Sequence, residues 1–141
     1  ALPISYLTVI DNVMVPGLST SIADQRTKAE GLLEKLGMGH RLGHLPSELS
    51  VGEQQRVALA RAVITSPKFL LADEPTGNLD SKTTKLVMEL FEQCNISGTT
   101  IIIATHDEGI YRRSANRVLE LHSGRLISSA DNTISTLNNM P

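Results

Sequence analysis

The sequence lacks the features that mark several classes of protein. It has a single cysteine, Cys94, so an internal disulfide is excluded, and its place on an apolar helical face indicates core packing. It shows no apolar run long enough to cross a bilayer and no secretory signal peptide. The net charge is −2, with Lys and Arg scattered rather than gathered into a basic stripe. We therefore expect a cytoplasmic chain that does not bind nucleic acid.

The sequence also lacks an initiator methionine. It begins Ala1-Leu2-Pro3-Ile4-Ser5, which resembles the translation of a common sequencing adapter. We therefore expect that the reading frame was cut, and we leave these five residues out of the fold prediction as a sequencing scar.

The length of 141 residues, 40% of them apolar, is sufficient for one buried core, so we expect one globular unit. Apolar residues recur at three- and four-residue steps over residues 21–36, which predicts an amphipathic helix that stops at Gly37. Ser50 and Glu53 have the spacing of a capping box, which predicts a second helix from Ser50 to about Thr65.

Two continuous apolar runs, residues 69–72 and 101–104, predict strands buried on both faces. Asp80 or Ser81 can cap a helix between them, and this alternation predicts a parallel α/β sheet flanked by helices. Residues 118–121 and 125–128 flank Ser123-Gly124, as in a hairpin. The polar residues 129–141 are expected to form a poorly ordered tail.

Each predicted central strand ends in polar residues, where ligands gather in open α/β sheets. The first delivers Asp73 and Glu74, and the second delivers Thr105, His106 and Asp107. Asp73 could hold Mg²⁺ while Glu74 deprotonates a water molecule. The alternative is that both carboxylates only begin a solvated turn.

The segment from Leu49 to Arg56 opens a predicted helix, whose free amides and dipole favour an anion. Gly52 would permit close approach, and the hydroxyl of Ser50 would add a hydrogen bond. The alternative is that Ser50 and Glu53 only cap the helix.

Taken together, these segments resemble the ATP-binding cassette family. The motifs are Leu-Ser-x-Gly-Glu with Gln-Gln-Arg, then Leu-Leu-Ala-Asp-Glu-Pro, Gly-Asn-Leu-Asp and Ala-Thr-His-Asp, and the resemblance runs from about Leu7 to Ile127. It implies a P-loop NTPase-like α/β fold with a helical subdomain that carries the signature motif. Residues 1–128 would form a partial ATP-binding domain.

The resemblance also implies roles for individual residues. The signature motif would contact the γ-phosphate of ATP held by the opposite subunit, and it comprises Leu49, Ser50, Val51, Gly52 and Glu53. The Walker B strand would run from Phe69 to Asp73, with Asp73 at the Mg²⁺ position and Glu74 as the catalytic base. The loop from Gly77 to Asp80 would cross the dimer interface, and His106 would sense the γ-phosphate.

The sequence departs from the family pattern at two points. Val51 stands where the family usually has glycine, which brings the contact with the partner's nucleotide into question. The phosphate-binding loop G-x-x-x-x-G-K-[ST] is absent, since none of the ten glycines precedes a lysine. We therefore expect a truncated gene model, and we predict that the chain as written neither binds ATP tightly nor hydrolyses it.

The segments around Pro46 and Ala72, with the closing Leu-Glu-Leu-His-Ser-Gly-Arg-Leu, resemble the lipoprotein-release, macrolide-export and cell-division ATPases. This implies an Mg²⁺-dependent ATPase that forms a homodimer or heterodimer and drives an integral-membrane permease from the inner face of the cell membrane. Two alternatives stay open: a non-transport member of the family, and a catalytically dead remnant that acts through interactions.

Overall fold

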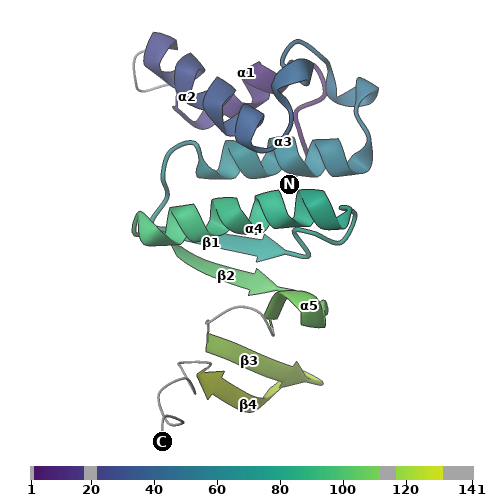
Figure 1. Cartoon of the computed structure of the whole chain (residues 1–141), viewed down its shortest axis with the longest axis vertical. Coiled ribbons are helices and arrows are strands. Elements are labelled where there is room, and N and C mark those ends of the chain that lie inside the picture. The colour runs from purple at the N-terminus through teal and green to yellow at the C-terminus, as the bar shows by residue number, and fades with distance from the viewer. Residues whose placement is uncertain (1, 18–21, 112–116, 132–141) are drawn as a thin grey trace, which may run out of the picture. The chain divides into compact units, whose positions relative to one another are not determined.

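A computed structural model describes residues 2–17, 22–111 and 117–131 of the chain (Figure 1). It divides into two compact units, Ala1–Ala104 and Thr105–Pro141, where composition had predicted one. Among the described residues, no helix has the length and apolarity needed to span a membrane.

The first part of the larger unit is helical. Three α-helices, α1 (Val9–Met14), α2 (Ile22–Lys35) and α3 (Val51–Val63), are joined by the 3₁₀ turns η1 (Val15–Gly17), η2 (Gly39–Arg41) and η3 (Pro46–Glu48). Their inward faces are fully buried and form one cluster, which includes Val9, Val13, Ala29, Leu33 and Val57. Burial of these side chains is the main force that holds such short helices together.

The helix predictions from the sequence are confirmed. Gly37, two residues after α2, has a φ of +69°, the left-handed conformation that glycine adopts without strain. Ser50 is the N-cap of α3, and its side chain accepts a hydrogen bond from the amide of Glu53. Helix α3 ends at Val63, close to the predicted Thr65.

The described residues of the first segment contact the helices, although the fold prediction left residues 1–5 out; that these residues are a sequencing scar stays a prediction. The amide of Ile4 donates to Oδ1 of Asn12 (2.6 Å), and Nδ2 of Asn12 donates back to the Ile4 carbonyl (3.0 Å). Nη2 of Arg61 in α3 donates to the Leu2 carbonyl (2.8 Å). Because Asn12 is fully buried, these bonds fix the segment against α1 and α3.

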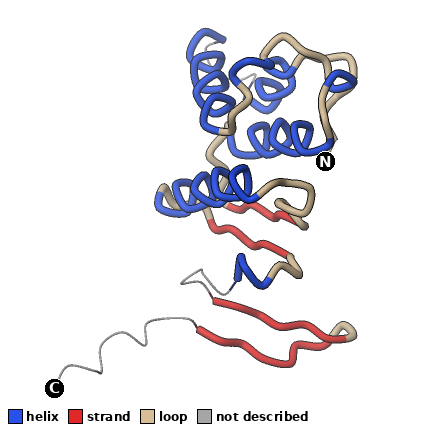
Figure 2. The backbone as a smooth tube through the Cα atoms, turned by 45° about the vertical axis from the view of Figure 1, so that its right-hand side comes forward, coloured by secondary structure: helices blue, strands red, loops and turns tan. Residues whose placement is uncertain are grey.

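The second part of this unit is a β-α-β arrangement. Strands β1 (Phe69–Asp73) and β2 (Thr100–Ala104) pair in parallel, with Phe69 opposite Thr100 and Asp73 opposite Ala104. Helix α4 (Ser81–Ile96) connects them and lies along one face of the pair (Figures 1 and 2). The buried residues of α4 are Thr83 and the apolar Val87, Leu90 and Phe91. The predicted parallel sheet is therefore confirmed.

The prediction that both strands are buried on both faces is wrong for the described residues. Leu70 is buried, but Phe69, Leu71 and Ile102 are 70%, 76% and 57% exposed. The reason is that side chains of a strand alternate between two faces and α4 covers only one of them.

The smaller unit holds helix α5 (Glu108–Tyr111) and strands β3 (Arg117–His122) and β4 (Arg125–Asp131). The strands pair in antiparallel fashion around Ser123 and Gly124, whose φ angles are +50° and +75°. This confirms the hairpin, since a two-residue turn with both φ angles positive matches the twist of the strands. Strand β4 includes residues 129–131, which composition had assigned to the tail, and residues 132–141 lie outside the described part.

Candidate functional site

Two carboxylates follow one another at the carboxyl end of β1. Asp73 is the last residue of the strand, and its side chain is exposed. The amide of Glu74 donates to the carbonyl of Ala104 at the end of β2 (2.9 Å). Glu74 has a φ of +44°, which is unusual for a residue other than glycine and is the kind of backbone strain that collects at functional sites. The parallel register therefore brings Asp73 and Glu74 to the sheet edge where ligands bind in α/β folds.

The loop after Glu74 is held by its own backbone. The amide of Gly77 donates to the Glu74 carbonyl (3.3 Å), and the amide of Leu79 donates to the carbonyl of Thr76 (3.0 Å). Thr76, in the middle of this loop, is buried. These bonds fix the route of the chain from the two carboxylates to the start of α4.

Asp80 closes this loop as the N-cap of α4. Its Oδ1 accepts from the amide of Thr83 (2.9 Å), and its Oδ2 accepts from the Thr83 hydroxyl (2.9 Å). The bond from the Thr83 amide, followed by that from its hydroxyl, holds the pKa of Asp80 below its ordinary value. In the chain by itself, the Asp80 carboxylate therefore caps helix α4. Its role at the nucleotide stays a prediction.

A reciprocal capping box forms the start of α3. The amide and the hydroxyl of Ser50 both donate to Oε2 of Glu53, at 2.8 and 2.9 Å, and the Glu53 amide donates to Oγ of Ser50 at 3.3 Å. Oε1 of Glu53 faces Nε of Arg41 in η2, at 3.3 Å. The bond from the Ser50 amide is the main reason that the pKa of Glu53 is lowered; burial opposes it, and the Ser50 hydroxyl and then Arg41 add to it.

Gly52 brings the start of α3 against the loop after β1. A β-carbon at position 52 would lie 3.0 Å from the carbonyl oxygen of Asn78 and 3.1 Å from Cδ2 of Leu79. The sequence predicts that Gly52 permits close approach of a phosphate. The close approach in the structure is instead to the segment Gly77–Asp80 of the same chain, and no sequence periodicity signals this contact.

The other residues of the predicted signature motif have different environments. Leu49 is 8% exposed and belongs to the core, so its side chain acts in packing. Val51 is 61% exposed and lies within α3, where a β-branched residue meets no backbone strain. The departure at Val51 is therefore compatible with the fold, and it places an apolar side chain on the surface next to Ser50.

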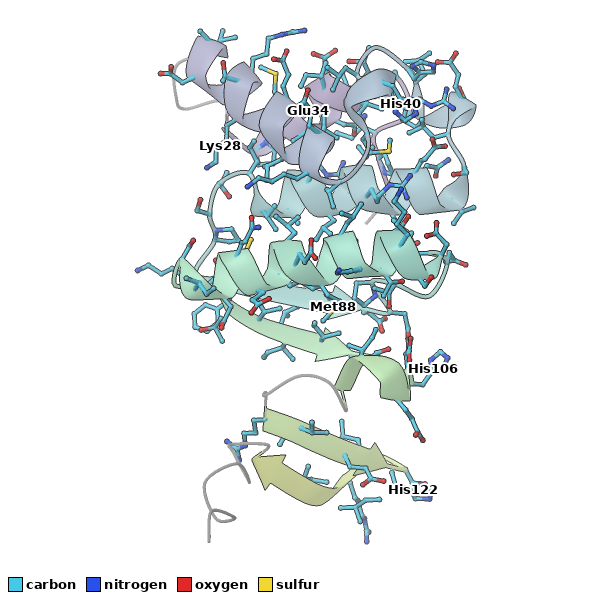
Figure 3. All side chains as sticks on the ribbon, viewed as in Figure 1. Lys28, Glu34, His40, Met88, His106 and His122 are labelled. Atoms are coloured by element: carbon cyan, nitrogen blue, oxygen red, sulfur yellow. The ribbon has the colours of Figure 1, made fainter. Side chains whose placement is uncertain are left out.

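His106 stands in the smaller unit and is exposed (Figure 3). The residues around it are ordered by short-range bonds: the amide of Asp107 donates to the Thr105 hydroxyl (3.1 Å), and that of Gly109 donates to Oδ1 of Asp107 (2.8 Å). The structure thus brings together Asp73 and Glu74 in one unit, while the sensing role of His106 stays a prediction.

The carboxyl end of β1 suits a magnesium ion that is bound partly by phosphate oxygens. No group of three His, Cys, Asp or Glu side chains that could hold a metal ion occurs in residues 2–17, 22–111 and 117–131. Asp73 is an exposed single carboxylate, and Mg²⁺ is commonly bound through one or two carboxylates together with phosphate oxygens and water. Asp73 therefore suits an ion that is carried with a nucleotide.

The chain matches known proteins in sequence. A family model described as ABC transporter matches residues 4–77, more than half of the 141 residues. A lipoprotein-releasing system ATP-binding protein LolD of Xanthomonas oryzae pv. oryzae (strain MAFF 311018) is 47% identical over 90% of this chain and 53% of its own length. A macrolide export ATP-binding/permease protein MacB of Hyphomonas neptunium is 44% identical over 92% of this chain and 20% of its own length. The chain thus spans about half the length of the lipoprotein-release relatives it matches.

It also matches solved structures. The dimeric structure of MJ0796, a bacterial ABC transporter cassette, aligns with a TM-score of 0.84 and 34% identity over 92% of this chain and 59% of that one. A post-hydrolysis state of the same cassette, bound to ADP and Pi, aligns with a TM-score of 0.83. Because the family model covers more than half of the chain, and the fold is that of a P-loop NTPase-type ABC cassette, the chain belongs to the ABC transporter family.

Proposed function

We propose that this chain is part of the ATP-hydrolysing subunit of a bacterial ABC transporter of the lipoprotein-release, macrolide-export or cell-division type. The observation that carries the proposal is the placement of Asp73 and Glu74 at the carboxyl edge of two parallel strands, with the Glu74 amide bound to the end of the neighbouring strand. The LolD and MacB relatives support the transporter type.

In the proposed reaction, Asp73 would hold the Mg²⁺ that accompanies ATP, and the bound ion would supply positive charge that neutralises the phosphates. Glu74 orients the attacking water and takes its proton on a carboxylate oxygen. Its fixed backbone amide limits the positions that this side chain can reach, which is the kind of positioning that phosphoryl transfer requires. His106 would sense the γ-phosphate from the start of the smaller unit.

The proposed assembly is a dimer of ATPase subunits, identical or not, that binds an integral-membrane permease at the inner face of the cell membrane. Each subunit would present the start of α3, with Ser50, Val51 and Gly52, to the nucleotide of its partner. Helix amides and the positive end of the helix dipole suit the γ-phosphate. The MJ0796 cassette is dimeric in its solved structure, which supports this arrangement.

The valine at position 51, where the family usually has glycine, favours a second candidate, a remnant that acts only through interactions. Two proteins separate the candidates: the 141-residue chain, and a chimera in which a relative's segment with the G-x-x-x-x-G-K-[ST] motif is joined ahead of it. The proposed function predicts ATP hydrolysis by the chimera and none by the chain alone. A chimera that folds, dimerises and fails to hydrolyse ATP would support the remnant.

The transporter assignment is tested separately through the genomic DNA on both sides of the reading frame. The proposal predicts an in-frame phosphate-binding loop upstream and a neighbouring gene for a permease with few membrane helices and a large extracytoplasmic domain. A stop codon upstream with no such loop would remove the ATPase activity from the account and leave the fold unchanged.

A further inference from the structure

The start of α3 carries a negative charge beside the amides that would receive a phosphate. The amides of Val51 and Gly52 have no hydrogen-bond partner in the part of the chain that the structure describes, as expected for the first turn of a helix. Glu53 lies on the same turn, and its carboxylate contacts both the amide and the hydroxyl of Ser50. A carboxylate on the same helical turn as these amides repels a phosphate that approaches them, because both groups are negatively charged.

Arg41 compensates this charge from outside the helix. Its Nε lies 3.3 Å from Oε1 of Glu53, on the side of the carboxylate that does not bind Ser50. The side chains of Arg41 and Glu53 are 33% and 15% exposed, so water and salt screen the pair less than they screen a surface pair. Nη1 of Arg41 also donates to Nε2 of His44 (3.0 Å), which fixes the guanidinium in place.

We propose that Arg41 is a positioning residue for the contact between the start of α3 and the γ-phosphate, acting by holding and neutralising Glu53. The proposal rests on the proposed function, and it adds a residue that lies outside every motif of the resemblance. Held by Arg41 on one oxygen and by Ser50 on the other, Glu53 caps the helix and stays clear of the Val51 and Gly52 amides. Without Arg41, the carboxylate keeps its charge and its bonds to Ser50, but Oε1 loses the contact that holds and neutralises it.

The test uses the chimera described above and measures KM for ATP and kcat separately. Arg41→Gln should raise KM roughly tenfold, the order expected for one uncompensated charge several ångströms from a phosphate, and change kcat much less. Arg56 also lies near Glu53, and its positive charge limits the rise in KM. Arg41→Lys should restore most of the affinity, because it keeps the charge.

The decisive variant, Glu53→Gln, removes the negative charge and keeps the capping geometry. Glutamine caps a helix as glutamate does, so this substitution should preserve the start of α3. In the Glu53→Gln background, Arg41→Gln should change KM less than about twofold, since no charge is left to neutralise. A tenfold rise in KM that persists in this background would overturn the proposal and assign Arg41 a purely structural role. Arg26→Gln, which breaks the exposed pair with Glu30 on α2, is the matched control and should leave KM unchanged.

A second measurement separates failure of this proposal from failure of the proposed function. In the 141-residue chain, carboxyl NMR titration should show a higher pKa of Glu53 in Arg41→Gln than in the unchanged chain or in Arg41→Lys. An unchanged pKa would contradict the coupling itself. A chimera that hydrolyses no ATP with Arg41 in place would instead contradict the proposed function, whatever the titration shows.

Discussion

Gly52 at the start of α3 lies so close to Asn78 in the loop before α4 that a β-carbon at position 52 would stand 3.0 Å from the Asn78 carbonyl oxygen. This contact joins two segments that are separate motifs in the family resemblance. It lies within one chain, and it sets the distance between the helix start and the loop that follows Asp73 and Glu74. The absence of a side chain at position 52 is therefore a requirement of the fold before any nucleotide is bound.

Replacement of Gly52 by alanine should lower the free energy of unfolding by about 1–2 kcal/mol, because backbone and Leu79 must both give way. Gly31→Ala is the matched control. Gly31 lies in α2, and a β-carbon added there would meet no atom within 4 Å, so alanine should stabilise the chain by up to about 1 kcal/mol. Urea denaturation of both variants measures the difference. Equal effects at the two positions would show that the contact with Asn78 is not tight.

The two faces of β1 should respond differently to truncation. Leu70→Ala removes a buried side chain from the core against α4 and should cost about 2–4 kcal/mol of unfolding free energy. Leu71→Ala on the exposed face should change it by less than about 0.5 kcal/mol. The same denaturation experiment checks both, and a large loss in Leu71→Ala would mean that this face is covered in solution.

Much of this arrangement was predictable from the sequence because it rests on local rules. The capping box of Ser50 and Glu53, the left-handed Gly37 and the Ser123-Gly124 turn each depend on a few neighbouring residues. The parallel pairing of β1 and β2 followed from the order of the elements. In contrast, an apolar run does not reveal whether one or both faces of a strand are covered, which is why the exposure of Phe69, Leu71 and Ile102 was not predicted.

Some residues of the candidate site were predictable from the sequence and others were not. Asp73 and Glu74 were found because they directly follow an apolar strand, and the structure places them at its carboxyl end. Arg41 was missed, and so was the contact of Asn78 with Gly52, since the contacts Arg41–Glu53 and Gly52–Asn78 join segments twelve or more residues apart and follow no periodicity. Such contacts depend on tertiary packing, which spacing along one sequence does not encode.

Acid should destabilise the chain partly through Glu53. Its pKa is lowered in the folded state, so its contribution to stability is fully present above the ordinary glutamate pKa, about 4.3, and is lost as the pH falls through the lower folded value. Unfolding free energy measured from about pH 6 downward should therefore drop more steeply in the unchanged chain than in Glu53→Gln. Asp80 contributes with the same sign in both proteins and cancels in the comparison. If the two proteins lose unfolding free energy equally as the pH falls, Glu53 does not contribute to the acid sensitivity.

Cys94 should be a poor nucleophile in the folded chain. It lies partly buried against the core, and burial raises the pKa of its thiol, so little thiolate is present at neutral pH. Reaction with a disulfide reagent at about pH 7 should be at least about tenfold slower in the native chain than in urea. If Cys94 reacts as fast in the native chain as in the unfolded chain, the face of α4 that carries Cys94 is accessible to the reagent and not packed against the core.

The measurement that tests the account most directly is ATP turnover by the chimera that carries a phosphate-binding loop, with and without Glu74→Gln. The account predicts that this substitution lowers kcat by a factor on the order of 10²–10⁴, the usual contribution of a general base, while dimers still form when ATP is added. Loss of turnover with retained dimers would establish Glu74 as the base at the edge of β1 and β2. Undiminished hydrolysis in Glu74→Gln would contradict the central claim and require another residue to activate the water.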